Sequence, residues 1–253
     1  MTGTDWIAHV SARRLRLATG IVLFVYVGTH LINHAVGIVS LSAAENVLSI
    51  AKSVWYSLPG TIVLYGAAAG HLLLALRTVY LRPHWRLPLV EYVRLGAGFS
   101  LPPLLIGHAV TTRLAFAMQG ANPRYASVVQ SLLSSGTEGW QLALLAPGWV
   151  HGCLGLWLTL ARYKPRREIR WTLFFLMAVV PCLAAVGFLS MRAEIAMYAA
   201  PAAPGAVVTP GSAGTDLQFW RKTLTFSYVL AVAGALVAGL TKRAIFNRAS
   251  RAG

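Results

Sequence analysis

The chain has 253 residues, of which 57% are hydrophobic and only 11% charged, and its mean hydropathy is +0.62. Soluble domains carry about twice that charged fraction, so the composition excludes an ordinary soluble protein and indicates an integral membrane protein. The formal net charge is +15, but the basic residues fall in alternate loops, and this pattern argues against nucleic-acid binding.

Six apolar segments are long enough to cross a bilayer, so we predict an all-α, polytopic membrane protein forming one transmembrane domain over residues 1–253. A short amphipathic helix is expected on the outer surface between the first two spans. Residues 119–139 are polar, are rich in Ser and Gly, and are expected to form an outer loop. The predicted spans are Leu17–Leu41, Gly60–Leu81, Leu95–Met118, Trp140–Ala161, Trp171–Met191 and Thr223–Thr241.

The basic residues predict the orientation of these spans. Of the 22 lysines and arginines, 15 lie before the first span, after the sixth, or in the loops that follow the second and fourth, and Arg77, near the end of the second span, makes 16 on that side. Because loops rich in Lys and Arg stay in the cytoplasm, both termini are expected there.

The first four predicted spans contain histidines, whereas the last two contain none. Span 1 carries His30 and His34, and the next three carry one each: His71, His108 and His151. At 1.5 Å per residue, His30 and His108 both lie ~20 Å from the cytoplasmic end of their helices, and His71 and His151 both lie ~16 Å from it. The counting therefore gives two depth-matched pairs, although the difference in depth between the pairs is only a few ångströms.

A histidine in hydrocarbon is costly unless it has a partner. Two neutral imidazoles that face each other across a helix bundle can bind one iron axially, and two such pairs suit two b haems. A direct metal site would not need two planes of two histidines, and a proton relay would recruit Asp or Glu, which these spans lack. We therefore predict haem iron bound by His30 with His108 and by His71 with His151.

The neighbours of these histidines leave several roles open. Arg77 and Arg113 could each pair with a haem propionate or could be interfacial arginines. His34 is the true ligand in place of His30, a quinone or propionate contact, or a packed polar residue. The small residues near the ligands, Gly66, Gly70, Gly107, Gly152 and Gly155, could seat a flat macrocycle or let helices approach closely.

The motif R-R-L-x4-G-x9-H-L-I-N-H and the stretch H-G-C-L-G-L-W at His151–Trp157 resemble the dihaem cytochrome b anchors of succinate dehydrogenases and fumarate reductases. In that family the first and third ligand helices hold one haem, and the second and fourth hold the other. The resemblance implies an electron-transfer anchor in a succinate:quinone or fumarate oxidoreductase. Those anchors have five spans, whereas a sixth is predicted here.

Six spans, together with T-H-L-I-N-H-A-V-G-I-V-S-L, P-G-T-I-V-L-Y-G and P-G-W-V-H-G-C-L-G-L-W, more closely resemble the hexahelical anchors of bacterial class III adenylate cyclases. This resemblance implies a redox or quinone sensor in the inner (plasma) membrane that controls cAMP synthesis. It also implies a homodimer whose ferredoxin-like and cyclase domains would follow residue 253. No catalytic domain is present in the 253 residues themselves.

Overall fold

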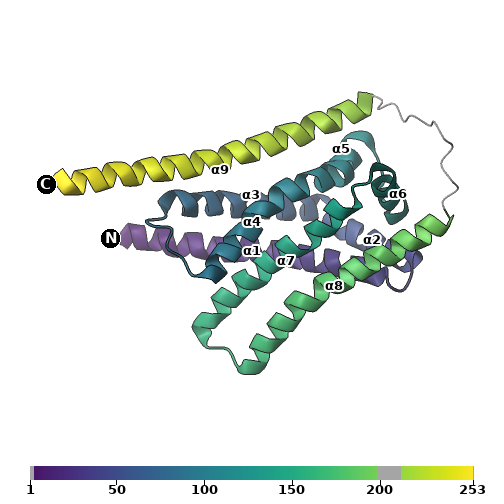
Figure 1. The fold of residues 1–253 in the computed structure, drawn as a ribbon, viewed down its shortest axis with the longest axis horizontal. Helices are drawn as coiled ribbons and strands as arrows, with labels where there is room; N and C mark the ends of the chain where they lie inside the picture. Colours follow the sequence, from purple (N-terminus) through teal and green to yellow (C-terminus); the bar gives the residue numbers. More distant parts are fainter. Residues whose placement is uncertain (1–2, 199–211, 253) are drawn as a thin grey trace.

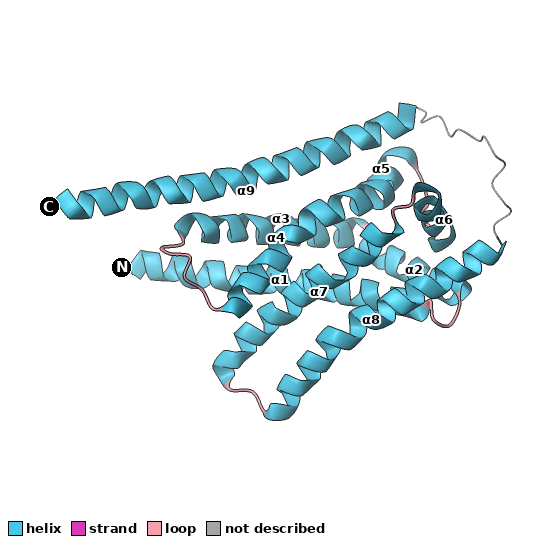
Figure 2. Cartoon of the chain, viewed as in Figure 1, coloured by secondary structure: helices cyan, strands magenta, loops and turns pink. Residues whose placement is uncertain are grey.

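The computed structural model describes residues 3–198 and 212–252, and the described residues form helices and short connections without strands (Figures 1 and 2). A π-helical segment, Val110–Leu114, joins α4 to α5, and a 3₁₀ turn, Ala161–Tyr163, follows α7. The α-helices are α1 (Gly3–Val36), α2 (Leu41–Trp55), α3 (Leu58–Leu81), α4 (Leu89–Ala109), α5 (Ala115–Gln119), α6 (Tyr125–Ser135), α7 (Glu138–Leu160), α8 (Arg167–Tyr198) and α9 (Ser212–Ala252).

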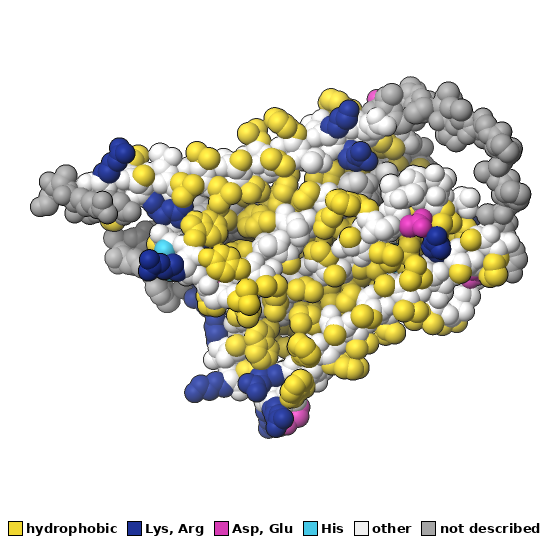
Figure 3. All heavy atoms as spheres, in the orientation of Figure 1, with side chains coloured by type: hydrophobic (Ala, Val, Ile, Leu, Met, Phe, Trp, Pro, Cys, Tyr) yellow, Lys and Arg dark blue, Asp and Glu magenta, His cyan; other side chains and the backbone are white. Residues whose placement is uncertain are grey.

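The predicted all-α membrane fold is confirmed. Six helical stretches are long and apolar enough to span a bilayer, and many of their large apolar side chains are exposed, as expected for surfaces that face lipid (Figure 3). The stretches are longer than predicted and run over Ser11–Val36, Leu58–Leu81, Leu89–Gln119, Glu138–Tyr163, Arg167–Met197 and Asp216–Phe246.

The four histidine-bearing helices form the centre of the bundle. Helix α1 packs against α3 and α7, and α4 packs against α7, whereas α3 and α4 make few direct contacts within the described chain. Helix α9 packs along both α3 and α4, and α8 packs along α1 and α7. Helices α1 and α4 are therefore diagonal neighbours, as are α3 and α7.

The two ends of this bundle differ. The chain enters and leaves at the same end (Figure 1), where the loops after α3 and α7 also lie, and we call this the basic end because it holds most of the basic side chains described. We call the opposite end the capped end because α2 and α6 cover it. Helix α2 confirms the predicted amphipathic segment, and its N-terminus is capped by Ser40, whose Oγ accepts from the Ala43 amide at 3.0 Å.

The prediction of a plain loop over residues 119–139 is wrong, because α6 forms within it. Tyr125 and Val129 lie one helical turn apart and are both buried against neighbouring helices. Gly120 and Gly136 end the helices before and within this segment, each with φ +64°, a conformation that glycine adopts without strain.

Candidate functional site

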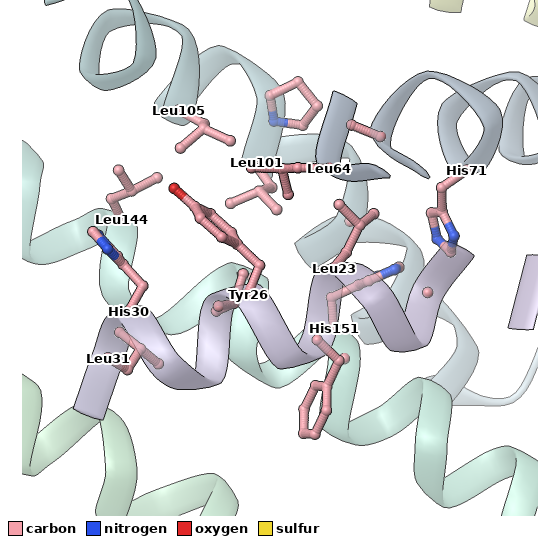
Figure 4. A pocket seen from close by; sticks show the side chains of 18 of the residues that line it. Leu23, Tyr26, His30, Leu31, Leu64, His71, Leu101, Leu105, Leu144 and His151 are labelled. Atoms are coloured by element: carbon pink, nitrogen blue, oxygen red, sulfur yellow. The ribbon is translucent and has the colours of Figure 1, made fainter. Parts of the chain in front are cut away.

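A cavity of about 1210 Å³ lies between α1, α3, α4 and α7. Pockets for single small ligands usually measure about 300–1,000 Å³, so this cavity has room for more than one such molecule. All five histidines of the predicted spans line it, together with mostly apolar side chains. Figure 4 shows His30 toward one end of the cavity and His71 with His151 toward the other, with Tyr26 and leucines between them.

The histidines face each other in the two diagonal pairs that the depth count predicted. The ring centroids of His30 and His108 are 5.8 Å apart, and those of His71 and His151 are 6.0 Å apart. An imidazole nitrogen binds a transition metal at about 2 Å, so two rings on opposite faces of one iron have centroids about 6 Å apart. Both centroid separations are close to that figure, and the rings of each pair meet edge to face, at interplanar angles of 67° and 87°.

The two pairs are further apart than the count suggested. Gly20 of α1 lies against the His71 ring, and His30 follows ten residues later on the same helix. Gly98 of α4 lies against the His151 ring, and His108 also follows ten residues later. Ten helical residues rise ~15 Å, so the pairs form two levels separated by that distance along the bundle.

Two of the histidines are held in the tautomer that leaves Nε2 able to bind a metal. His151 Nδ1–H donates to the carbonyl of Arg94 at 2.8 Å. His71 Nδ1 lies 3.2 Å from Thr19 Oγ1, and that hydroxyl donates to backbone carbonyls of its own helix, so it accepts from the imidazole. A hydrogen bond at one ring nitrogen fixes the orientation of a ligand histidine and leaves the other nitrogen for the metal.

His108 is held by the side-chain amide of Gln141, a buried residue near the start of α7. Gln141 Nε2 lies 2.9 Å from His108 Nδ1. A side-chain amide can present its nitrogen or, after half a turn, its oxygen to the same partner. With Oε1 facing the ring, Nδ1–H donates and Nε2 of His108 keeps the lone pair that a metal needs.

The structure favours His30 over His34 as the partner of His108. His34 Nε2 lies 3.3 Å from His30 Nε2, and the two rings meet edge to face. The His34 ring also contacts Tyr125 and Phe188, whereas among the described residues only His30 makes a ring contact with His108. His34 therefore lies beside this pair, on its capped-end side.

The glycines that approach the histidines are not the ones the sequence suggested. A Cβ at Gly98 would lie 2.5 Å from the His151 ring, and one at Gly20 would lie 3.2 Å from the His71 ring. Gly152 instead lies against Phe24, and Gly66 has no neighbour within 4 Å of where a Cβ would be. Each glycine that contacts a histidine therefore comes from a facing helix.

The arginines also differ from expectation. Arg113 lines the cavity at the capped end, where it donates to Thr61 Oγ1 at 2.7 Å and lies over the Tyr56 ring at 4.5 Å. Arg113 belongs to the π-helical segment that begins two residues after His108, a feature frequent at functional sites. Arg77 is exposed and does not line the cavity. The arginines that line its basic end are Arg13, Arg14, Arg16, Arg94 and Arg162.

The residues at the basic-end level fit a haem held by His71 and His151, because each ring has an Nδ1 contact that leaves Nε2 for a metal and each lies against glycine backbone. At the capped-end level His108 has such an Nδ1 contact, whereas His30 Nε2 lies 3.3 Å from His34 Nε2, so His30 would have to turn away from His34 to bind a metal through Nε2. No cluster of three or more His, Cys, Asp or Glu side chains suited to a bare metal ion occurs in the described parts of the chain. An axial haem site needs only two protein ligands.

Comparison with known proteins adds no family to this geometry. The chain matches no protein-family model, no curated protein and no solved structure.

A repeated sequence pattern marks several site residues that the histidine positions alone do not indicate. The pattern R-L-x2-G-x9-H occurs twice, as Arg16–His30 in α1 and as Arg94–His108 in α4. In both copies the arginine lines the basic end of the cavity, the glycine contacts a histidine of one pair, and the histidine belongs to the other pair. Gln141 has no comparable signal beyond being an amide in an apolar segment.

Proposed function

We propose that this chain is a dihaem b-type cytochrome membrane anchor that exchanges electrons with the quinone pool and regulates a cytoplasmic adenylate cyclase as a redox sensor. The observation that carries the proposal is the pair of diagonal histidine contacts, at 5.8 and 6.0 Å, across one apolar cavity. Four imidazoles that line an apolar cavity in a membrane bundle are costly without a group between them, which favours haem.

In this proposal His30 and His108 bind the haem near the capped end, and His71 and His151 bind the haem near the basic end. Bound haem supplies an iron that takes up and releases one electron. Gln141, Thr19 and the Arg94 carbonyl orient three of the four rings. Guanidinium groups grip carboxylates in bidentate fashion, so Arg16 and Arg94 suit propionates at the basic end and Arg113 suits those at the capped end.

The capped end is the better place for a quinone headgroup. Asn33 Oδ1, His34 Nδ1 and Tyr125 Oη are buried without a hydrogen-bond partner in the described chain, and all three residues line the cavity beside His30. Burial raises the pKa of the Tyr125 phenol, which keeps it protonated and able to donate. Unpaired buried donors and acceptors favour a ligand that carries oxygen atoms.

Helix α9 supports a sensor rather than an electron-transfer anchor alone. Tyr228 Oη donates to the carbonyl of Phe99 at 2.7 Å, and the preceding residue, Gly98, contacts the ring of His151. The sixth span is thus in contact with backbone that supports one histidine pair. Both termini lie at the same end, so a domain after α9 would adjoin the basic end (Figure 1).

The proposal is tested on the purified full chain by a reduced-minus-oxidised absorbance spectrum and by haem content per chain. We expect b-type bands and two haems. His108→Ala should remove one haem and His71→Ala the other, whereas His84→Ala, an exposed loop histidine, should remove neither. A protein without b-type bands, or one in which neither single variant lowers the haem content, would refute the proposal.

The alternative, an anchor of a succinate:quinone or fumarate oxidoreductase, shares the haem sites and differs in its partner. Copurification from the native membrane distinguishes the two proposals. A cyclase activity that copurifies with the chain and changes with the quinone redox state supports the sensor. A flavoprotein and an iron–sulfur subunit bound at the basic end would support the oxidoreductase instead.

A further inference from the structure

A second cationic site lies at the basic end, outside the cavity, where α3 meets α9. Arg243 of α9 donates from Nη1 to the carbonyl of Arg82, the residue that ends α3, at 2.6 Å. Lys242 lies over the Tyr80 ring at 5.0 Å, and the Arg82 guanidinium lies over the Trp85 ring at 5.4 Å. None of these five residues lines the histidine cavity.

This cluster contains cationic groups without an anion. Arg82 Nε and Arg243 Nη2 are buried and have no hydrogen-bond partner among the described residues. No ion pair joins Arg82, Lys242 or Arg243 to a carboxylate within the described chain; the nearest acid in sequence, Glu91, pairs with Arg94 at 2.6 Å. Both arginines are partly exposed as whole side chains, and three positive charges without a carboxylate repel one another, so an anion from outside the chain is expected at their exposed atoms.

The position of this cluster at the ends of two spans indicates what kind of acceptor it binds. Arg82 follows the last residue of the second span, and Lys242 and Arg243 lie near the end of the sixth, Asp216–Phe246. Tyr and Trp side chains gather where hydrocarbon meets headgroups, so Tyr80 and Trp85 place the cluster at the level of lipid phosphates. Basic pockets between spans at such a boundary bind anionic headgroups.

We propose that Arg82 and Arg243, with Lys242, bind the phosphate group of an anionic phospholipid at the α3–α9 junction. The guanidinium groups supply the hydrogen bonds, and Lys242 supplies a third charge. Exposed Leu81, Ile245 and Phe246 lie next to these residues in the chain and offer apolar surface to acyl chains. Figure 3 shows dark blue basic side chains at this end of the molecule, bordered by yellow apolar ones.

The bound lipid would fasten α9 to α3. Close to this point Gly239 lies against the Tyr80 backbone, where a Cβ would be 3.0 Å from the Tyr80 carbonyl oxygen. The two helices therefore meet backbone to backbone, and the anionic headgroup would neutralise the charge that they bring together. This lipid site does not depend on haem binding.

The test compares lipid binding by the delipidated full chain in neutral detergent. Dioleoyl phosphatidylglycerol, dioleoyl phosphatidylcholine and inorganic phosphate are titrated separately, and bound lipid is counted by native mass spectrometry beside the midpoint of thermal unfolding. We expect phosphatidylglycerol to bind and to raise the midpoint, and phosphatidylcholine to do neither. Each basic residue near an anionic surface contributes about fivefold, so Arg82→Gln with Arg243→Gln should weaken phosphatidylglycerol binding about 25-fold.

The control is the double variant Arg166→Gln with Arg167→Gln, which removes the same charge from exposed positions at the same end and should bind phosphatidylglycerol like the unsubstituted chain. Equal binding by both double variants would overturn the proposal, as would an unsubstituted chain that does not prefer phosphatidylglycerol. Stabilisation by inorganic phosphate without phosphatidylglycerol binding would assign the site to a free anion and overturn the lipid assignment. The haem spectrum of the Arg82/Arg243 variant is recorded as well. If it matches that of the unsubstituted chain, a loss of lipid binding concerns the lipid site alone and does not bear on the cytochrome proposal.

Discussion

Gly98 of α4 lies against the ring of His151 so closely that any larger residue at position 98 would collide with the imidazole. The backbone of α4 thus forms the surface on which the α7 histidine rests. Gly20 of α1 lies against His71 less closely, because a Cβ there would be 3.2 Å from the ring. The basic-end pair is therefore held by two helices that supply no histidine to it.

Gly98→Ala should remove haem from the basic-end site. The added Cβ would lie 2.5 Å from the His151 ring, a distance that only a shift of the ring or of α4 can relieve. We expect haem content to fall from two to one per chain in the pyridine haemochrome assay. Gly66→Ala is the control because nothing lies within 4 Å of its Cβ position; retention of both haems by Gly98→Ala would contradict the packing argument.

Gln141→Ala should weaken the capped-end haem. The substitution removes the side-chain amide that lies 2.9 Å from His108 Nδ1. Loss of a hydrogen-bond partner of a metal-binding histidine typically lowers metal affinity 10–100-fold. The expected result is preferential loss of one b component when the protein is titrated with apomyoglobin as a haem acceptor. Gln130→Ala, an exposed amide on α6, should have no effect on either component.

Arg113→Gln and Arg77→Gln should differ in their effect on haem binding, although the sequence leaves the same two roles open for both arginines. Arg113 lines the cavity and Arg77 is exposed away from it. We expect Arg113→Gln to speed haem loss from the capped-end site and Arg77→Gln to leave both sites unchanged. Rescue by Arg113→Lys should be incomplete, since a lysine cannot make the bidentate contact to a carboxylate. An effect of Arg113→Gln no larger than that of Arg77→Gln would contradict the assignment of Arg113 to a propionate.

Tyr228→Phe should shift the reduction potential of the basic-end haem only. In the proposed sensor, the oxidation state of this haem affects the position of α9 through His151, Gly98 and the Tyr228–Phe99 hydrogen bond. Coupling of this kind is reciprocal, so a change in α9 must alter the reduction potential of the haem by the same coupling free energy. One hydrogen bond contributes about 1 kcal/mol, so the shift should be at most about 40 mV for a one-electron couple.

The potentials of the two components are measured by optical redox titration, with Thr225→Val as the control because its hydroxyl bonds only within α9. Two unshifted potentials in Tyr228→Phe would show that this contact does not couple α9 to the haem.

The sequence was sufficient for the six spans and for which histidine rings lie together, because hydropathy and residue counts along helices depend on local geometry. It was insufficient for the separation of the two levels. The count started at Leu17, whereas the first span starts at Ser11 and α1 at Gly3. The true start places His30 further from the basic end than the count did, and this widens the gap to His71.

Contacts between distant segments could not be predicted from the sequence either, because they depend on how the helices pack. The contacts of the Gln141 amide, of the Thr19 hydroxyl and of the glycines facing His71 and His151 depend on which helix faces meet, and a single sequence does not reveal this. Helix α6 is not evident from the sequence because its serines favour a loop. The helical spacing of Tyr125 and Val129, which are both buried, is the one signal for it. The positive-inside pattern places the basic-end arginines outside the spans, and which of them line the cavity depends on how the helices pack.

Helices α1 and α4 each carry a glycine at one level and a histidine at the other, ten positions apart on the same helix. Pro102 and Pro103 lie between the two positions of α4, whereas α1 has no proline between Gly20 and His30. A shift of α1 along its axis would therefore move Gly20 relative to His71 and His30 relative to His108 together, while α4 can bend between its two contacts.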